Sequence, residues 1–156
     1  MFLTTHALAS SLLAEKIKNP LLAYPLILAI HFLMDSIPHW DFGAYAGDEL
    51  PKKGQIKSGN KRFKLGLLGA LDLSMVVLGS WLIFRNKLLT NPFLIGGILV
   101  GLLPDFLEVP PLFLNWRPFP LNKLEEFHSR KVHREAKFIL GLIPQIIILI
   151  LVFWLR

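Results

Sequence analysis

The residues best suited to chemistry lie in one stretch, His31-Phe-Leu-Met-Asp35-Ser-Ile-Pro38-His39-Trp40-Asp41, which begins inside an apolar segment and ends just outside it. His31 and Asp35 are four residues apart, so on a helix their side chains share one face. Pro38 ends that helix, and His39 and Asp41 follow in a turn that can fold back over it. Ionisable side chains in apolar surroundings are costly and mark functional sites. We therefore predict a metal site built from imidazole and carboxylate ligands.

Further ionisable residues accompany the other apolar segments. Asp72 is the single acidic residue within 65–84, and Asp105 follows the glycines at 97 and 101. A structural ion pair is the alternative for Asp72, but no cation lies at its depth in any segment. We predict catalytic roles for Asp72 and Asp105, either of which can act as a general base. The predicted metal ligands are His6, His31, Asp35, His39, Asp41, Asp72, Asp105, His128 and His133.

Several of these residues have simpler interpretations. His6 alone in a short helix suits a hydrogen-bonded packing residue, and His39 and Asp41 suit a helix cap with an interfacial turn. On an ideal helix, His128 and His133 point about 140° apart. Both reach one site only if their helix breaks or the metal centre is extended. Glu108 lies near Asp105 and is a further candidate ligand.

The composition indicates a membrane protein. The chain has 156 residues, enough for a single domain over 1–156, and 53% of them are hydrophobic. It has no cysteine, which excludes disulfides, thiolate ligands and a cysteine nucleophile. Histidine and carboxylate donors suit zinc first, with manganese, magnesium or iron as alternatives. The formal charge of +6 without a basic patch interleaved with aromatics favours anionic lipid headgroups over nucleic acid as partners.

The helices that the apolar segments form must position these residues. The apolar pattern predicts an all-α, polytopic membrane helical bundle of four to five apolar helices plus a cytoplasmic amphipathic helix. The first segment is short for a span, since about 20 residues are needed, and suits a short, re-entrant or interfacial helix. The small residues Gly97 and Gly101 predict close packing by another helix. The predicted apolar helices cover 2–17, 21–37, 65–84, 93–107 and 138–155, with a flexible basic loop at about 43–64 and an interfacial amphipathic helix at about 122–137.

The lysine and arginine residues predict the orientation. If the five apolar segments alternate across the bilayer, five of the 17 cations lie at one end and the other twelve lie at the end that carries the histidines. The positive-inside rule makes the histidine end cytoplasmic. The sequence also shows no secretory signal. We therefore expect a multi-pass protein of the cytoplasmic (inner) membrane, with its N-terminus and site toward the cytoplasm and its C-terminus outside.

Three motifs carry a family resemblance. Thr5-His6 lies near the N-terminus, Asp35-Ser-Ile-Pro38-His39-Trp-Asp41 follows an early membrane segment, and His128-Ser-Arg-Lys-Val-His133 comes later. Their order and spacing resemble those of the bacterial membrane-bound metal-dependent hydrolases of the YdjM type. The resemblance implies a small multi-pass protein with hydrolase activity and leaves the substrate open.

The leading hypothesis is a membrane-embedded metal-dependent hydrolase that acts on a phosphoester or other lipid-linked substrate at the cytoplasmic face through metal-activated water. A transporter of metal ions or protons is the first alternative, because buried carboxylates and histidines also pass cations. A non-catalytic membrane protein with a structural metal or a buried polar network is the second. The sequence leaves the metal, the number of ions and the oligomeric state open.

Overall fold

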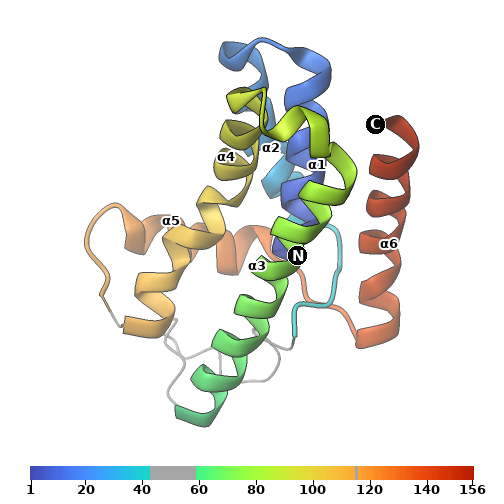
Figure 1. Ribbon diagram of the computed structural model, residues 1–156. Coiled ribbons are helices and arrows are strands. Elements are labelled where there is room, and N and C mark those ends of the chain that lie inside the picture. Colours follow the sequence, from blue (N-terminus) through green and yellow to red (C-terminus); the bar gives the residue numbers. More distant parts are fainter. Residues whose placement is uncertain (43–58, 115) are drawn as a thin grey trace.

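The computed structural model describes residues 1–42, 59–114 and 116–156 (Figure 1). In this part of the chain it contains helices and one isolated β-bridge, between His39 and Glu135. The all-α class predicted from the sequence is therefore confirmed. The elements are α1 (Leu3–Ile17), α2 (Pro20–Ser36), α3 (Gly59–Leu88), α4 (Pro92–Val109), the π-helical η1 (Pro110–Leu114), α5 (Leu121–Phe127), the π-helical η2 (His128–Val132) and α6 (Phe138–Leu155).

Three helical stretches in the described residues are long and apolar enough to cross a membrane: Gly59–Arg85, Pro92–Leu114 and Phe138–Leu155. Pro20–Ser36 is a shorter apolar helix. The outer faces of the long helices expose large aliphatic and aromatic side chains, among them those of Leu78, Leu99 and Ile147. An apolar surface this extensive is stable against lipid tails rather than water. These helices therefore indicate a membrane protein.

The short helix α1 lies at the centre of the bundle, in contact with α2, α3, α4 and α6. Most of its side chains are buried, including small polar ones such as Ser10 and Ser11. Close packing against α4 explains this choice of residues. A Cβ added at Gly97 would lie 2.7 Å from the Cβ of Ala14, and one added at Gly101 would lie 2.7 Å from the Cβ of Ser10. The predicted packing surface of Gly97 and Gly101 is thus confirmed, and its partner is α1.

The apolar helices alternate in direction. In Figure 1, α1 (blue) rises from the N-terminus and α2 returns, α3 (green) rises, α4 descends, and α6 (red) rises to the C-terminus. The far ends of α1 and α3 are joined by an ion pair between Glu15 and Lys87. The C-terminal Arg156 donates to the carbonyl of Ile83 at the same end, at 3.5 Å. The start of α1, the end of α2 and the start of α6 therefore share the opposite end of these helices.

Two predicted boundaries differ from the structure. The basic loop expected at 43–64 is shorter, because α3 begins at Gly59; the rest of that prediction, 43–58, lies outside the described residues. The amphipathic helix expected at 122–137 ends at Val132. Beyond it the chain is extended, because Arg134 accepts from the backbone N–H of His39 at 3.0 Å and Ala136 donates to the His39 carbonyl at 2.7 Å. This pairing with the segment after α2 replaces helical hydrogen bonds.

Gly101→Ala tests the packing of α4 on α1. The added methyl group meets Ser10, so we expect a loss of roughly 1–3 kcal/mol of stability, as overpacked sites show. Thermal unfolding in detergent measures the effect. Gly69→Ala on α3 is the matched control, because a Cβ there meets nothing within 4 Å and alanine favours helix by about 1 kcal/mol. Equal unfolding temperatures for Gly101→Ala and the wild type would contradict the close approach.

Candidate metal centre

Asp35, near the end of α2, is fully buried and is the point on which the other groups converge. Its Oδ1 accepts from the Met1 amine at 2.7 Å and lies 3.1 Å from His6 Nε2. Its Oδ2 lies 2.7 Å from His128 Nε2 and 3.3 Å from His31 Nε2. A buried carboxylate needs such partners, because its charge is otherwise very costly away from water. The predicted pairing of His31 with Asp35 on one helix face is present.

The backbone of α4 fixes the tautomer of His31. Its Nδ1 lies 2.8 Å from the carbonyl oxygen of Gly101. Because a carbonyl only accepts, Nδ1 carries the proton and Nε2 carries the lone pair. This Nε2 is buried and makes no hydrogen bond among the described residues. It lies 3.8 Å from Asp105 Oδ1, and Asp105 Oδ2 is also buried without a hydrogen bond.

His6 completes the first set of donor atoms. Its ring stacks on that of His31, with centroids 4.1 Å apart. One donor atom from each of His6, His31, Asp35 and Asp105 lies within 4.8 Å of the others. Two imidazoles and two carboxylates are a donor set that fits zinc or manganese. Four of the nine predicted ligands therefore lie where one divalent ion can reach them all.

A second set of donor atoms consists of Asp35, His39 and His133, again within 4.8 Å of one another. Nδ1 of His39 donates to the carbonyl of Ile37 at 2.8 Å, which leaves its Nε2 bare and 3.7 Å from Asp35 Oδ1. Burial and the charge of the Met1 amine lower the pKa of His39 to about 4 and that of His133 to about 2. Both rings are therefore neutral, as ligands must be.

His128 lies in the same cluster but is occupied on both nitrogens. Nε2 is 2.7 Å from Asp35 Oδ2, and Nδ1 is 2.8 Å from Glu108 Oε1. Burial alone would lower the pKa of His128, but the hydrogen bonds to Asp35 and Glu108 raise it to about 10. As an imidazolium it donates to both carboxylates and has no lone pair to offer. In this arrangement His128 orients Asp35, and its predicted role as a metal ligand stays a prediction.

Asp72 and Asp41 belong to neither donor set. The carboxylate of Asp72 accepts from the backbone N–H groups of Leu3 at 2.7 Å and Thr4 at 3.1 Å. It therefore caps the first turn of α1, and this contact explains a buried acid in α3 without a metal. Asp41 follows α2 and faces the pocket described next. The prediction that either residue ligates a metal, or that Asp72 is catalytic, stays a prediction.

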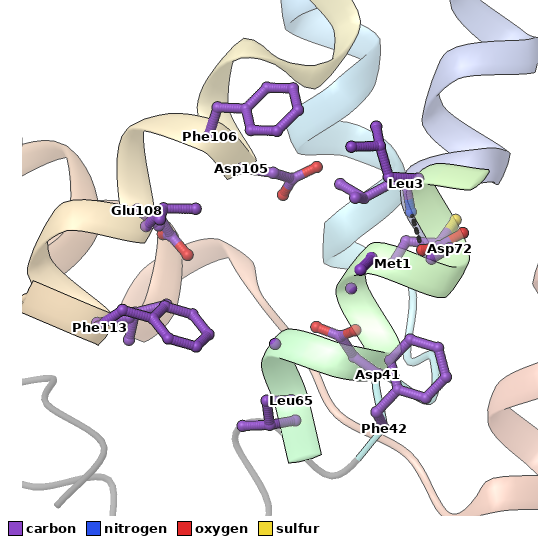
Figure 2. Close-up of a pocket in the computed structure, with 16 residues that line it drawn as sticks. Met1, Leu3, Asp41, Phe42, Leu65, Asp72, Asp105, Phe106, Glu108 and Phe113 are labelled. Atoms are coloured by element: carbon purple, nitrogen blue, oxygen red, sulfur yellow. Dashed lines mark hydrogen bonds between the residues drawn. The ribbon is translucent and has the colours of Figure 1, made fainter. Parts of the chain in front are cut away.

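A pocket of about 470 Å³ lies between α3 and the end of α4. Figure 2 shows the carboxylates of Asp41, Asp105 and Glu108 around it, together with the rings of Phe106 and Phe113. The remaining lining is mostly aliphatic and includes the α3 residues Leu65, Gly69 and Leu73. Since Asp105 belongs both to the first donor set and to the pocket wall, the pocket adjoins the candidate metal centre.

Gln145 is a positioning residue that the sequence reasoning missed. Its Oε1 accepts from the N–H of Phe2 at 2.9 Å, and its Nε2 donates to the carbonyl of Trp40 at 2.8 Å. It therefore fixes the start of α1 against the chain that follows α2. A lone amide inside the apolar run of 138–155 is the signal that would have found it, because polar groups in membrane helices bond across helices.

Comparisons with protein-family models, curated proteins and solved structures give no match for this chain. The resemblance to the YdjM-type hydrolases therefore depends on the three sequence motifs alone.

Asp72→Ala tests the capping role. Loss of the bonds to Leu3 and Thr4 is expected to cost about 0.5–2 kcal/mol, as other lost helix caps do, while metal binding is retained. Thermal unfolding and metal analysis of the same preparation give the two readouts. Ser74→Ala, which removes only a hydrogen bond to the carbonyl of Ala70 on the exposed face of α3, is the control. Loss of metal with unchanged stability would instead place Asp72 among the ligands.

Proposed function

We propose that the protein is a membrane-embedded metal-dependent hydrolase acting on a phosphoester or other lipid-linked substrate. The observation that carries the proposal is the orientation of His31. The carbonyl of Gly101 holds its Nδ1–H, and its bare Nε2 is buried 3.3 Å from Asp35 Oδ2 and 3.8 Å from Asp105 Oδ1. A lone pair facing anionic oxygens is unfavourable unless a cation lies between them. This geometry favours a bound ion over a purely structural polar network.

The surrounding residues suit hydrolysis. His6, His31, Asp35 and Asp105 would hold a divalent ion, which when bound would supply Lewis acidity to activate a water molecule and polarise the scissile group. Asp105 is the residue of the set that borders the pocket, and its Oδ2 makes no hydrogen bond among the described residues. We assign it as the general base that takes the proton of the attacking water. The pair of Glu108 and His128 holds Asp35 in place.

The pocket supports an amphiphilic substrate. Among its acidic residues Asp105 belongs to the first donor set, whereas its walls of leucine, valine and phenylalanine suit an acyl or isoprenoid chain. Its volume falls in the range of small-ligand sites, about 300–1,000 Å³. Because α3 and α4 are long enough to span a membrane, a pocket between them is accessible to a lipid. The polar end of that lipid would then meet Asp105.

The distribution of cations supports a cytoplasmic location for the centre. Twelve of the 17 lysine and arginine residues belong to the segments at the histidine end, and basic segments of this kind stay in the cytoplasm and attract anionic headgroups. We therefore place the protein in the cytoplasmic membrane of a bacterium, with zinc as the first candidate ion. Cysteine-scanning accessibility at Lys123 and at Lys87 distinguishes the two faces.

His31→Ala tests the ion. The purified wild-type protein is expected to bind zinc or manganese near stoichiometrically and to hydrolyse lipid phosphoesters in a chelator-sensitive way, and His31→Ala is expected to lose both properties. Metal analysis and product release are the measurements. Glu126→Ala, on the exposed side of α5, is the control. Metal content that is unchanged in His31→Ala would exclude this centre, and metal uptake into proteoliposomes without hydrolysis would favour transport.

Gly69→Trp tests the pocket. An indole at this position fills the space between α3 and α4, so we expect kcat/KM for a long-chain phosphate ester to fall about tenfold, equivalent to roughly two buried methylene groups. A short-chain ester should be hydrolysed as before. Gly59→Trp is the matched control, since it also lies on α3 with nothing within 4 Å of an added Cβ but does not line the pocket. Equal losses for both esters would show that the pocket does not hold the chain.

A further inference from the structure

A second pocket lies between α3 and α4, farther from the candidate metal centre. Its volume is about 530 Å³, and its walls include Val77, Ser80 and Trp81 of α3 and Ile95 and Ile98 of α4. We call it the far pocket, and we call the pocket that Asp105 borders the near pocket. Both pockets belong to helices that are long and apolar enough to cross a membrane.

The two pockets follow one another along the same pair of helices. On α3, Leu73 lines the near pocket and the next residue, Ser74, lines the far pocket. On α4, Asp105 and Ile98 are seven residues apart, which is about two helical turns, so they lie on one face of the helix. The pockets therefore lie in series along one groove between α3 and α4, which we call the α3–α4 groove.

The floor of the α3–α4 groove is α1. Ala7 packs with Val76 of α3 and with Leu102 of α4 in one buried cluster. The opposite side is open, because Val77 and Ile95 line the far pocket and are 67% and 45% exposed. A molecule in the groove is thus covered by three helices and can enter from the side that faces lipid tails.

The polarity changes along the groove. The near pocket carries the carboxylates of Asp41, Asp105 and Glu108 and adjoins the candidate metal centre (Figure 2), whereas no charged residue is among those found to line the far pocket. The Ser80 hydroxyl in its wall is buried and makes no hydrogen bond among the described residues. Such unpaired groups are rare in folded proteins, and this one borders space that the fold leaves unfilled. An ion at one end and an apolar pocket at the other complement an anionic head with a long chain.

We infer that the α3–α4 groove holds the chain of a single-chain lipid phosphate, whose head lies at the candidate ion and whose tail ends in the far pocket. The inference rests on the proposed function and narrows its substrate class to phosphate esters of one long apolar chain. Because the pockets lie in series rather than side by side, one chain fills both. From Asp105 to Ile95 the helix rises about 15 Å, roughly half of the hydrocarbon thickness of a bilayer. The chain must be at least this long to fill the far pocket.

Fluorescence quenching tests the inference without turnover. Trp81 lines the far pocket, whereas Trp154 on α6 lines neither pocket. The two indoles lie toward the same end of the bundle, where Arg156 donates to the carbonyl of Ile83. The full chain, supplied with zinc in detergent, is titrated with a long-chain alkyl phosphonate that carries bromine at the far end of its chain. A phosphonate is not hydrolysed, and bromine quenches indoles only at short range. We expect saturable quenching in the wild type and in Trp154→Phe, and its loss in Trp81→Phe.

Two further comparisons locate the chain. A phosphonate with bromine beside its head should leave Trp81 unquenched, since the bromine is then held about 15 Å away. Ser80→Leu fills the far pocket and should raise the Kd of the far-end-brominated phosphonate about tenfold, equivalent to roughly two displaced methylene groups. Leu82→Phe is the control, because it is exposed on the same helix and lines neither pocket.

Equal quenching of Trp81 and Trp154, or quenching that does not saturate, would overturn the inference, because the lipid would then only surround the protein. A dimer whose Trp81 no lipid quenches would also overturn it, since a second copy would then occupy the groove. Competition by two-chain phosphatidate as strong as that by the unlabelled single-chain phosphonate would overturn the restriction to one chain. Saturable quenching of Trp81 in a protein that cleaves no phosphate ester would support the groove while overturning the proposed hydrolysis. Hydrolysis without such quenching would overturn the groove alone.

Discussion

A single buried carboxylate organises the functional end of this molecule. Asp35 is removed from water, and removing the partners of such a charge costs roughly 3–5 kcal/mol. Its partners come from the N-terminus, α1, α2, the segment after α2 and η2, at positions as far apart as Met1 and His128. The need to compensate one charge thus draws together parts of the chain that share no sequence proximity. The surrounding helices supply the low-polarity medium in which that compensation is strong.

The packing of α1 on α4 sets the geometry that Asp35 requires. Gly101 has two roles at once: its missing side chain lets α1 approach, and its carbonyl fixes the tautomer of His31. A larger residue would separate α4 from α1, which carries the His6 ring that stacks on His31. The close packing of α1 on α4 and the chemistry of the site therefore both depend on Gly101.

The sequence predicts the apolar helices and identifies the ionisable residues within them. His31, Asp35 and Asp105 were found because ionisable groups contrast with an apolar segment. The central position of α1 could not be predicted, because its buried serines and threonines give it a weaker apolar signal than the outer helices have. The capping of α1 by Asp72 and the backbone pairing that brings the predicted ligand His133 beside His39 were also hidden, since both depend on contacts between distant segments. Local patterns carry no information about such pairings.

The short extended pairing after α2 also affects how the protein is made. Residues 1–36 can form the hairpin of α1 and α2 as soon as they leave the ribosome. The segment that contains His39, however, finds its partners at Arg134 and Ala136 only about a hundred residues later. During translation the carboxylate of Asp35 has Met1, His6 and His31 at once but must wait for His128. The polar cluster around Asp35 is therefore completed only when the final third of the chain, which carries His128, has been synthesised.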